Sequence, residues 1–205
     1  LYTYWLYDYA GVNPQNGNAL WRNEEGLLTE NYGEARRINA GSPEPLWTGG
    51  FNTELSWKGI SLGIQLEARY GNKVLNQDRS LFEADGSYGD SNIWKGALNY
   101  WKKPGDTNVL PKPIYNNSSN SSQISTRYLE DGSYLRIKDI TLAYNLPSKW
   151  TKKALMSGVR IYASALNLYT FHNMNYWDPE HGTTGATIIS YPMTRSMIVG
   201  VDITF

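Results

Sequence analysis

Apolar and polar residues alternate with a period of two in several segments of about ten residues. The clearest segment is 60–70, in which every second residue is apolar and the residues between are polar or glycine. Just before it, 51–57 alternates in the same way, and Lys58-Gly59 between the two suits a tight turn. Residues 51–70 are therefore expected to form an antiparallel hairpin.

Three further segments carry strand patterns: 134–145, 159–169 and 197–205. In 134–145 the alternation slips at Lys138-Asp139, and one extra residue there would restore a single apolar face. The slip therefore predicts a β-bulge. Strands of about ten residues have the length that crosses a membrane when they are tilted.

The connections between these segments come in two sizes. Lys58-Gly59 and 147–157 are short or moderate, whereas 71–127 and 171–191 are long, polar and rich in Gly, Asn and Ser. Long loops without a pattern argue against a compact soluble domain. Short turns at one end of the strands and long loops at the other are the layout of an outer-membrane barrel. The Asn/Ser run 116–122 predicts a flexible loop tip.

Alternation alone does not separate two folds. In a soluble sandwich the apolar face packs on a second sheet, whereas in a membrane barrel it meets lipid and the opposite face lines the lumen. Aromatic residues at the strand ends favour the barrel, because its girdles lie there: Trp57, Tyr70, Tyr144, Trp150, Tyr169, Phe171 and Phe205. The predicted fold is all-β, an antiparallel transmembrane β-barrel segment with long extracellular loops. The alternative is a soluble, secreted carbohydrate-binding β-sandwich.

Composition narrows the function. The 205 residues carry 19 basic and 19 acidic side chains, so no basic surface for nucleic acid is expected. The absence of cysteine excludes disulfides, thiolate metal sites and cysteine nucleophiles. The two histidines accompany no G-x-S-x-G serine and no P-loop, so the chain is not expected to be an enzyme.

Longer motifs add a family resemblance. The runs 127–147 and 159–171 resemble the signature near the end of SusC/RagA-type TonB-dependent outer-membrane receptors. Asp178-Pro179-Glu180, then Tyr191-Pro192 and a last strand ending in Phe205, follow in the family's order. The residues that mark the motif are Gly132, Tyr134, Leu135, Arg136, Asn167, Leu168, Asp178, Pro179 and Glu180. The upstream stretches 10–21, 45–52 and 101–106 are also similar to the family, with Asn13 where Asp is usual and Ala165 where Gln or a small residue is common.

The resemblance implies that residues 1–205 are the C-terminal portion of a larger receptor barrel. About five or six strands of a barrel of about 22 would lie here, with extracellular loops at 71–127 and 171–191. The plug domain and the TonB-contacting segment would lie upstream of Leu1. The whole receptor would be an integral outer-membrane protein that imports oligosaccharides, or peptides, using TonB and a SusD-like surface lipoprotein as partners. It implies no cofactor.

Candidate functional residues are mostly loop aromatics, which are expected to contact a ligand or a lid protein: Trp94, Tyr100, Trp101, Tyr115, Tyr176 and Trp177. By resemblance, Phe205 belongs to the signal that the barrel-assembly machinery recognises. The charged residues of the strands are expected to face the lumen: Glu67, Arg69, Arg136, Lys138, Arg160 and Asp202.

The segment Asp178-Pro179-Glu180-His181 brings two carboxylates and an imidazole together. A metal site is disfavoured, because no second ligand cluster with a defined spacing accompanies it. The segment is instead expected to structure a loop, with Asp178 capping a turn. The sequence therefore predicts no metal ligand and no catalytic residue.

Overall fold

The computed structural model describes residues 2–89, 92–180, 185–187 and 193–205. The chain forms two compact units, and each is drawn from three separate stretches of sequence. The loop unit comprises residues 1–44, 72–131 and 181–190. The sheet unit comprises residues 45–71, 132–180 and 191–205.

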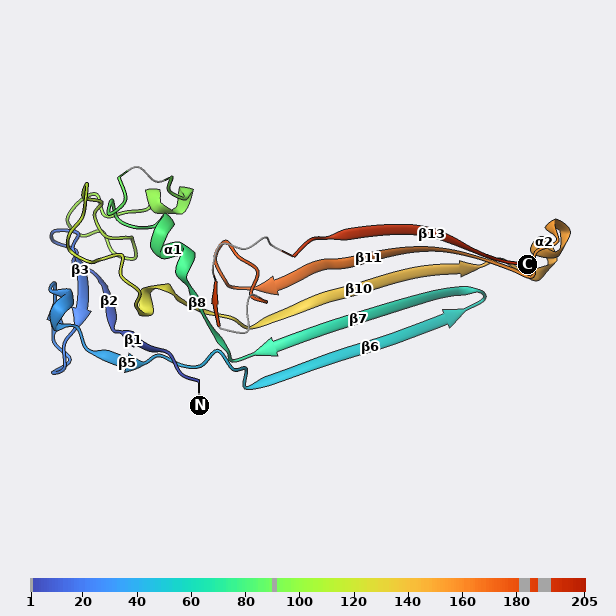
Figure 1. Ribbon diagram of the computed structural model, residues 1–205, viewed down its shortest axis with the longest axis horizontal. Helices are drawn as coiled ribbons and strands as arrows, with labels where there is room; N and C mark the ends of the chain where they lie inside the picture. Colours follow the sequence, from blue (N-terminus) through green and yellow to red (C-terminus); the bar gives the residue numbers. More distant parts are fainter. Residues whose placement is uncertain (1, 90–91, 181–184, 188–192) are drawn as a thin grey trace. The chain divides into compact units, whose positions relative to one another are not determined.

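The sheet unit contains one five-stranded antiparallel sheet, whose strands lie side by side in the order β13-β11-β10-β7-β6 (Figure 1). The strands are β6 (Trp47–Trp57), β7 (Ile60–Tyr70), β10 (Tyr134–Asn145), β11 (Gly158–His172) and β13 (Ser196–Thr204). Two short helices connect β10 to β11, α2 (Ser148–Thr151) and the 3-10 helix η4 (Lys152–Ala154). The predicted all-β, antiparallel class is confirmed, although β6 begins four residues before the predicted hairpin and β11 runs beyond Tyr169.

β6 and β7 form the predicted hairpin around Lys58-Gly59. The φ angles of these two residues are 48° and 87°, and a two-residue type I′ turn needs a positive φ at both positions. A Cβ added at Gly59 would also lie 2.9 Å from the carbonyl oxygen of Asn145. Glycine is therefore required there both for its backbone conformation and for the close approach of β10.

One face of the sheet is apolar on all five strands. The pairing places Leu62 opposite both Leu55 and Leu142, and Ile161 opposite Val201. The face is also exposed, with Leu55 62% accessible and Val201 54% accessible. Within the described residues these side chains are not packed beneath a second sheet, as a sandwich would require.

The predicted bulge in β10 lies at Lys138. Leu66 and Gln65 of β7 are consecutive, but their partners Ile137 and Asp139 are separated by Lys138. The bulge leaves Lys138 out of the pairing, so the apolar positions before and after it stay on the same face of the sheet.

The loop unit is built from short segments, which form one two-stranded and two three-stranded sheets in its described part. Its strands are β1 (Trp5–Tyr7), β2 (Tyr9–Val12), β3 (Ala19–Arg22), β4 (Leu28–Thr29), β5 (Arg37–Asn39), β8 (Lys73–Asn76), β9 (Leu129–Asp131) and β12 (Ala186–Thr187). Its helices are α1 (Gln77–Phe82) and the 3-10 helices η1 (Tyr32–Glu34), η2 (Lys95–Leu98) and η3 (Thr126–Tyr128). The stretch 71–127, which shows no pattern in sequence, therefore carries regular structure.

The apolar core of the loop unit is small. Leu6, Leu75 and Tyr128 form a buried cluster. Trp21 is fully buried and meets the rings of Tyr9 and Tyr32 edge-on, at centroid distances of 5.4 and 5.1 Å. Edge-to-face aromatic pairs stabilise a fold by more than their buried area alone. A few aromatic rings therefore stabilise this core, as aliphatic side chains do in larger cores. Across the described ranges, no helix is both long enough and apolar enough to span a membrane.

Candidate functional site

The polar face of the sheet carries a ladder of charges across β7 and β10. The ammonium group of Lys138 lies 2.9 Å from one carboxylate oxygen of Glu67. The other oxygen of Glu67 accepts a hydrogen bond from the Tyr134 hydroxyl at 2.8 Å. Arg69 lies 3.7 Å from the same carboxylate. These charges therefore neutralise one another on the side of the sheet opposite the apolar face.

Arg136 connects this ladder to the loop that follows β11. Its guanidinium group is fully buried and forms ion pairs with both Asp178 and Glu180. It also donates a hydrogen bond from Nε to the Thr170 hydroxyl at 2.9 Å. Lys138 reaches the other oxygen of Glu180 at 3.5 Å. A buried arginine held at this many points fixes the position of the loop against the sheet.

The turn itself forms as its sequence suggests. The backbone N–H of Glu180 donates to the Asp178 carboxylate at 2.9 Å, which is the side-chain turn that Asp favours. His181 and Tyr191-Pro192 lie outside the described residues. Among the residues that the structure describes, no group of three or more metal-ligating side chains comes together.

A cavity of about 320 Å³ lies beside this turn. Asn167, Thr170 and His172 of β11 line one part of it. The rest is lined by residues of the connection between β11 and β13: Tyr176, Trp177, Asp178, Met193 and Arg195. Two of the aromatic residues predicted to contact a ligand, Tyr176 and Trp177, therefore belong to one cavity.

The other four predicted aromatics lie in the loop unit and do not form one site. Trp94 stacks on Phe82 at a centroid distance of 4.7 Å. Trp101 donates a hydrogen bond from its indole nitrogen to the carbonyl of Pro14 at 3.1 Å. Tyr100 is half-buried, whereas Tyr115 is 79% exposed. Trp94 and Trp101 thus contribute to packing within the loop unit, and Tyr115 is the ring most accessible to a partner.

Trp101 is also the link between two of the family-like motifs. A Cβ at Gly17, where φ is +82°, would come within 2.6 Å of the Trp101 ring. The backbone of Lys112 donates to the carbonyl of Gly17 at 2.8 Å. The stretches 10–21 and 101–106 therefore pack against each other in the loop unit.

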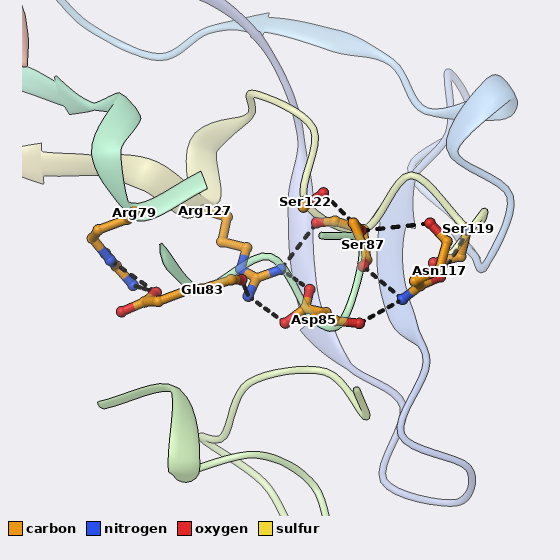
Figure 2. Close-up of polar contacts among 9 residues, drawn as sticks. Arg79, Glu83, Asp85, Ser87, Asn117, Ser119, Ser122 and Arg127 are labelled. Carbon is orange, nitrogen blue, oxygen red and sulfur yellow. Dashed lines mark hydrogen bonds and ion pairs between the residues drawn. The ribbon is translucent and has the colours of Figure 1, made fainter. Parts of the chain in front are cut away.

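The loop unit holds a buried ion pair that the sequence analysis missed. Arg127 pairs with Asp85, and both side chains are almost completely buried (Figure 2). The guanidinium group also donates to the carbonyls of Ser121 at 2.9 Å and Glu83 at 3.1 Å. Burial alone would lower the pKa of Arg127, but the hydrogen bond and the charge of Asp85 raise it, so the arginine stays charged.

Arg79 forms a second buried charge cluster nearby in the same unit. It pairs with Glu83 at 2.8 Å, as Figure 2 shows, and with Glu130 at 2.7 Å. Burial lowers its pKa, and the two carboxylates more than offset that effect. The sequence signal was weak, because the partners of Glu130 and Arg127 are 51 and 42 residues away.

The Asn/Ser run 116–122 was expected to be a flexible tip, and the structure instead ties it to these charges. The amide of Asn117 donates to the carbonyl of Asp85 at 3.2 Å, and Ser122 lies 3.2 Å from Ser87 (Figure 2). Ser121 is 1% exposed. The end of the run is therefore held at Arg127 through the Ser121 carbonyl, whereas Asn116 and 118–120 are exposed.

Three asparagines of the motif at 10–21 surround one carboxylate. The amides of Asn13, Asn16 and Asn18 donate to Glu30 at 2.5, 2.8 and 2.7 Å. The hydrogen bonds from Asn18, Asn16 and Asn13 together lower the pKa of Glu30, although burial acts in the opposite direction. An aspartate at position 13 would have no side-chain N–H to donate, so Asn13 and Glu30 suit each other.

The chain matches known proteins over most of its length. It is 31% identical to TonB-dependent receptor P3 of Formosa agariphila over 83% of this chain and 17% of the relative. It is 28% identical to TonB-dependent receptor P26 of the same organism over 96% of this chain and 19% of the relative. No family model matches the chain.

Solved structures give the same picture. This chain matches the structure of the RagAB peptide transporter with a TM-score of 0.84 and 30% identity. The match covers 99% of this chain and 23% of the transporter chain. The RagAB peptide importer in the open-open state matches equally, with a TM-score of 0.84. The chain thus spans about a fifth of the length of its relatives.

A sheet with an exposed apolar face and an ion-paired polar face, matched throughout by receptor barrels, is a segment of a transmembrane β-barrel. Its relatives are receptors and transporters rather than enzymes. The chain belongs to the TonB-dependent receptors, and its structural match is to the RagA type.

Proposed function

We propose that the receptor containing this chain lies in the outer membrane and imports oligosaccharides, or alternatively peptides, with energy delivered through TonB. A SusD-like surface lipoprotein would hold the substrate over the extracellular loops. The carrying observation is the apolar face, which continues across all five strands and stays exposed. Such a face suits lipid, and the neutralised charges behind it suit a water-filled or plugged lumen.

The remaining roles follow from this proposal. Residues 1–205 would be the C-terminal portion of the barrel, and TonB would act through a segment upstream. Phe205, which is 86% exposed, would belong to the assembly signal. Tyr115 and the other loop aromatics would contact substrate or lipoprotein. A peptide cargo has support from RagAB, which is described as a peptide transporter.

Uptake by cells tests the proposal directly. The gene for the full-length receptor is deleted, and import of fluorescent oligosaccharides and fluorescent peptides is measured with and without a protonophore. Loss of import on deletion, and equal loss with the protonophore, is the expected result. Import that survives both treatments contradicts the proposal, and the labelled compound whose import is lost identifies the cargo class.

Membrane insertion separates the barrel from the alternative, a soluble carbohydrate-binding sandwich. The full-length receptor is expected in the outer-membrane fraction, with a folded band that shifts on heating before electrophoresis. Recovery in the aqueous fraction without detergent would favour the sandwich.

A further inference from the structure

The cavity beside the Asp178 turn combines features of a ligand site that the charge ladder does not need. It is about 320 Å³ in volume, at the lower end of the range of about 300–1,000 Å³ for small-molecule pockets. Two adjacent aromatic residues, Tyr176 and Trp177, line it together with Arg195. We propose that this cavity is a binding subsite for a sugar ring that carries a carboxylate group. The inference rests on the proposed import function.

Arg195 indicates that the ligand carries a negative charge. The other arginines of the sheet unit are all paired: Arg69 with Glu67, Arg136 with Asp178 and Glu180, and Arg160 with Asp202. Arg195 has no carboxylate partner among the described residues, although its side chain lines the cavity. A guanidinium group binds a carboxylate with two parallel hydrogen bonds.

Asp178, which lines the cavity, and Glu180 nearby do not oppose such a ligand. Asp178 lines the cavity, but its charge is engaged by Arg136. Glu180 is engaged by both Arg136 and Lys138. Because these carboxylates are neutralised inside the sheet unit, the unpaired charge at the cavity is the positive one of Arg195.

The two aromatic residues indicate that the ligand contains a sugar ring. Tyr176 has a φ of 66°, and the backbone N–H of Trp177 donates to the carbonyl of Asn175 at 2.8 Å, so the two aromatics sit on a tight turn. Flat aromatic rings pack against the C–H face of a sugar, while amide and hydroxyl groups bind its oxygens. Asn167 and Thr170 present such groups in the same cavity.

Arg136 acts on this subsite as a positioning residue. It is buried beneath the turn and touches Asp178, Glu180 and Thr170 rather than the cavity's open space. The turn that carries Tyr176 and Trp177 runs directly into Asp178. Loss of Arg136 therefore displaces the rings without removing any group that would contact the ligand.

The test titrates the full-length receptor in detergent with D-glucuronate, D-glucose and triglycine, followed by ligand-observed NMR. Glucuronate has the ring and the carboxylate, glucose only the ring, and triglycine only the carboxylate. Wild type is expected to bind glucuronate more tightly than either of the others. Arg195→Gln should weaken glucuronate about tenfold, as expected for one charged hydrogen-bonded contact, and leave glucose unchanged.

Arg160→Gln is the matched control, because Arg160 lies in the same sheet unit but pairs with Asp202 at 3.4 Å. It should leave glucuronate binding unchanged. Trp177→Ala should weaken glucuronate and glucose alike. For the positioning role, Arg136→Met should weaken both sugars, and Arg136→Lys should restore part of the binding because it keeps the charge.

Three results would overturn the inference. They are equal binding of glucuronate and glucose, equal effects of Arg195→Gln and Arg160→Gln, and triglycine binding as tight as glucuronate. Failure of the proposed function is recognised separately, because uptake of every labelled substrate would then survive both deletion of the receptor gene and the protonophore. A receptor that imports normally but shows no preference for glucuronate disproves only the subsite.

Discussion

The two units of the chain differ in where their large apolar side chains lie. In the sheet unit many large apolar residues are exposed, and the largest fully buried side chain is an arginine, Arg136. In the loop unit Trp21 and Tyr128 are fully buried, but a buried Arg127–Asp85 pair lies among them. A continuous exposed apolar face of this kind suits contact with lipid. The loop unit, by contrast, is held by hydrogen-bonded charges and a few rings, because its short segments provide little aliphatic surface.

The largest expected effect comes from breaking the buried pair of the loop unit. Arg127→Met leaves Asp85 buried without its cation, which typically costs about 3–5 kcal/mol. Hydrogen exchange of residues 72–131 in the full-length receptor should become markedly faster. The double variant Arg127→Met with Asp85→Leu should recover much of the protection, since no lone charge remains. Unchanged exchange in the single variant would show that this pair does not hold the unit.

A charge on the apolar face tests the other half of the comparison. Leu62→Arg should destabilise the receptor by about 2–4 kcal/mol if the position lies near the middle of the bilayer. The measurement is a denaturant titration of the receptor in lipid vesicles. Gln65→Arg, on the polar face of the same strand, is the control and should cost much less. Equal costs at the two positions would contradict a lipid-facing surface.

The hairpin turn gives a smaller effect on the sheet unit. Gly59→Val places a β-branched residue at a φ of 87° and brings its Cβ near the carbonyl of Asn145. Strain of this kind costs about 1–3 kcal/mol, measured by the same titration. Lys58→Gly, which relieves a positive φ instead of creating strain, should be neutral or slightly stabilising. A neutral Gly59→Val would mean that β10 does not approach the turn so closely.

The smallest expected effect is a pH dependence in the loop unit. The folded-state pKa of Glu30 is lowered below the value of 4.5 that the group has when unperturbed. Its contribution to stability is therefore fully present above about pH 4.5 and is lost as the pH falls through the lower, folded-state pKa. Glu30→Gln should flatten this part of the acid-unfolding curve, followed by tryptophan fluorescence. Because Glu30 is largely exposed, water screens its interactions and the effect on stability is small. Identical acid-unfolding curves for both proteins would show that Glu30 does not contribute to this pH dependence.

The sequence was informative where one physical rule acted along the strand. The period-two alternation predicted the first and last residues of β7 and β10, and its slip at Lys138 predicted the bulge. Both predictions were possible because a lipid-facing strand needs an apolar residue at every second position. The same rule says nothing of the loop unit. There Arg127 meets a partner 42 residues away, and no local pattern announces such a pair.

The candidate site was predicted only in part for a related reason. Tyr176 and Trp177 were identified as possible contacts from their residue type, and the structure places both at one cavity. Arg195 was not identified, because its significance depends on the pairing of every other arginine in the sheet unit. The loop aromatics of the other unit remain predictions as ligand contacts.

The bulge at Lys138 has a consequence for how this strand tolerates length changes. Deleting one residue from a strand normally moves every side chain beyond it to the opposite face of the sheet. Here the deletion of Lys138 would leave Ile137, Asp139 and Ile140 in uninterrupted alternation, and the pairing with β7 would become regular. Lys138 is thus not needed for the register of the strand, and its side chain contacts Glu67 and Glu180. A receptor lineage could gain or lose this charge without rebuilding the barrel wall.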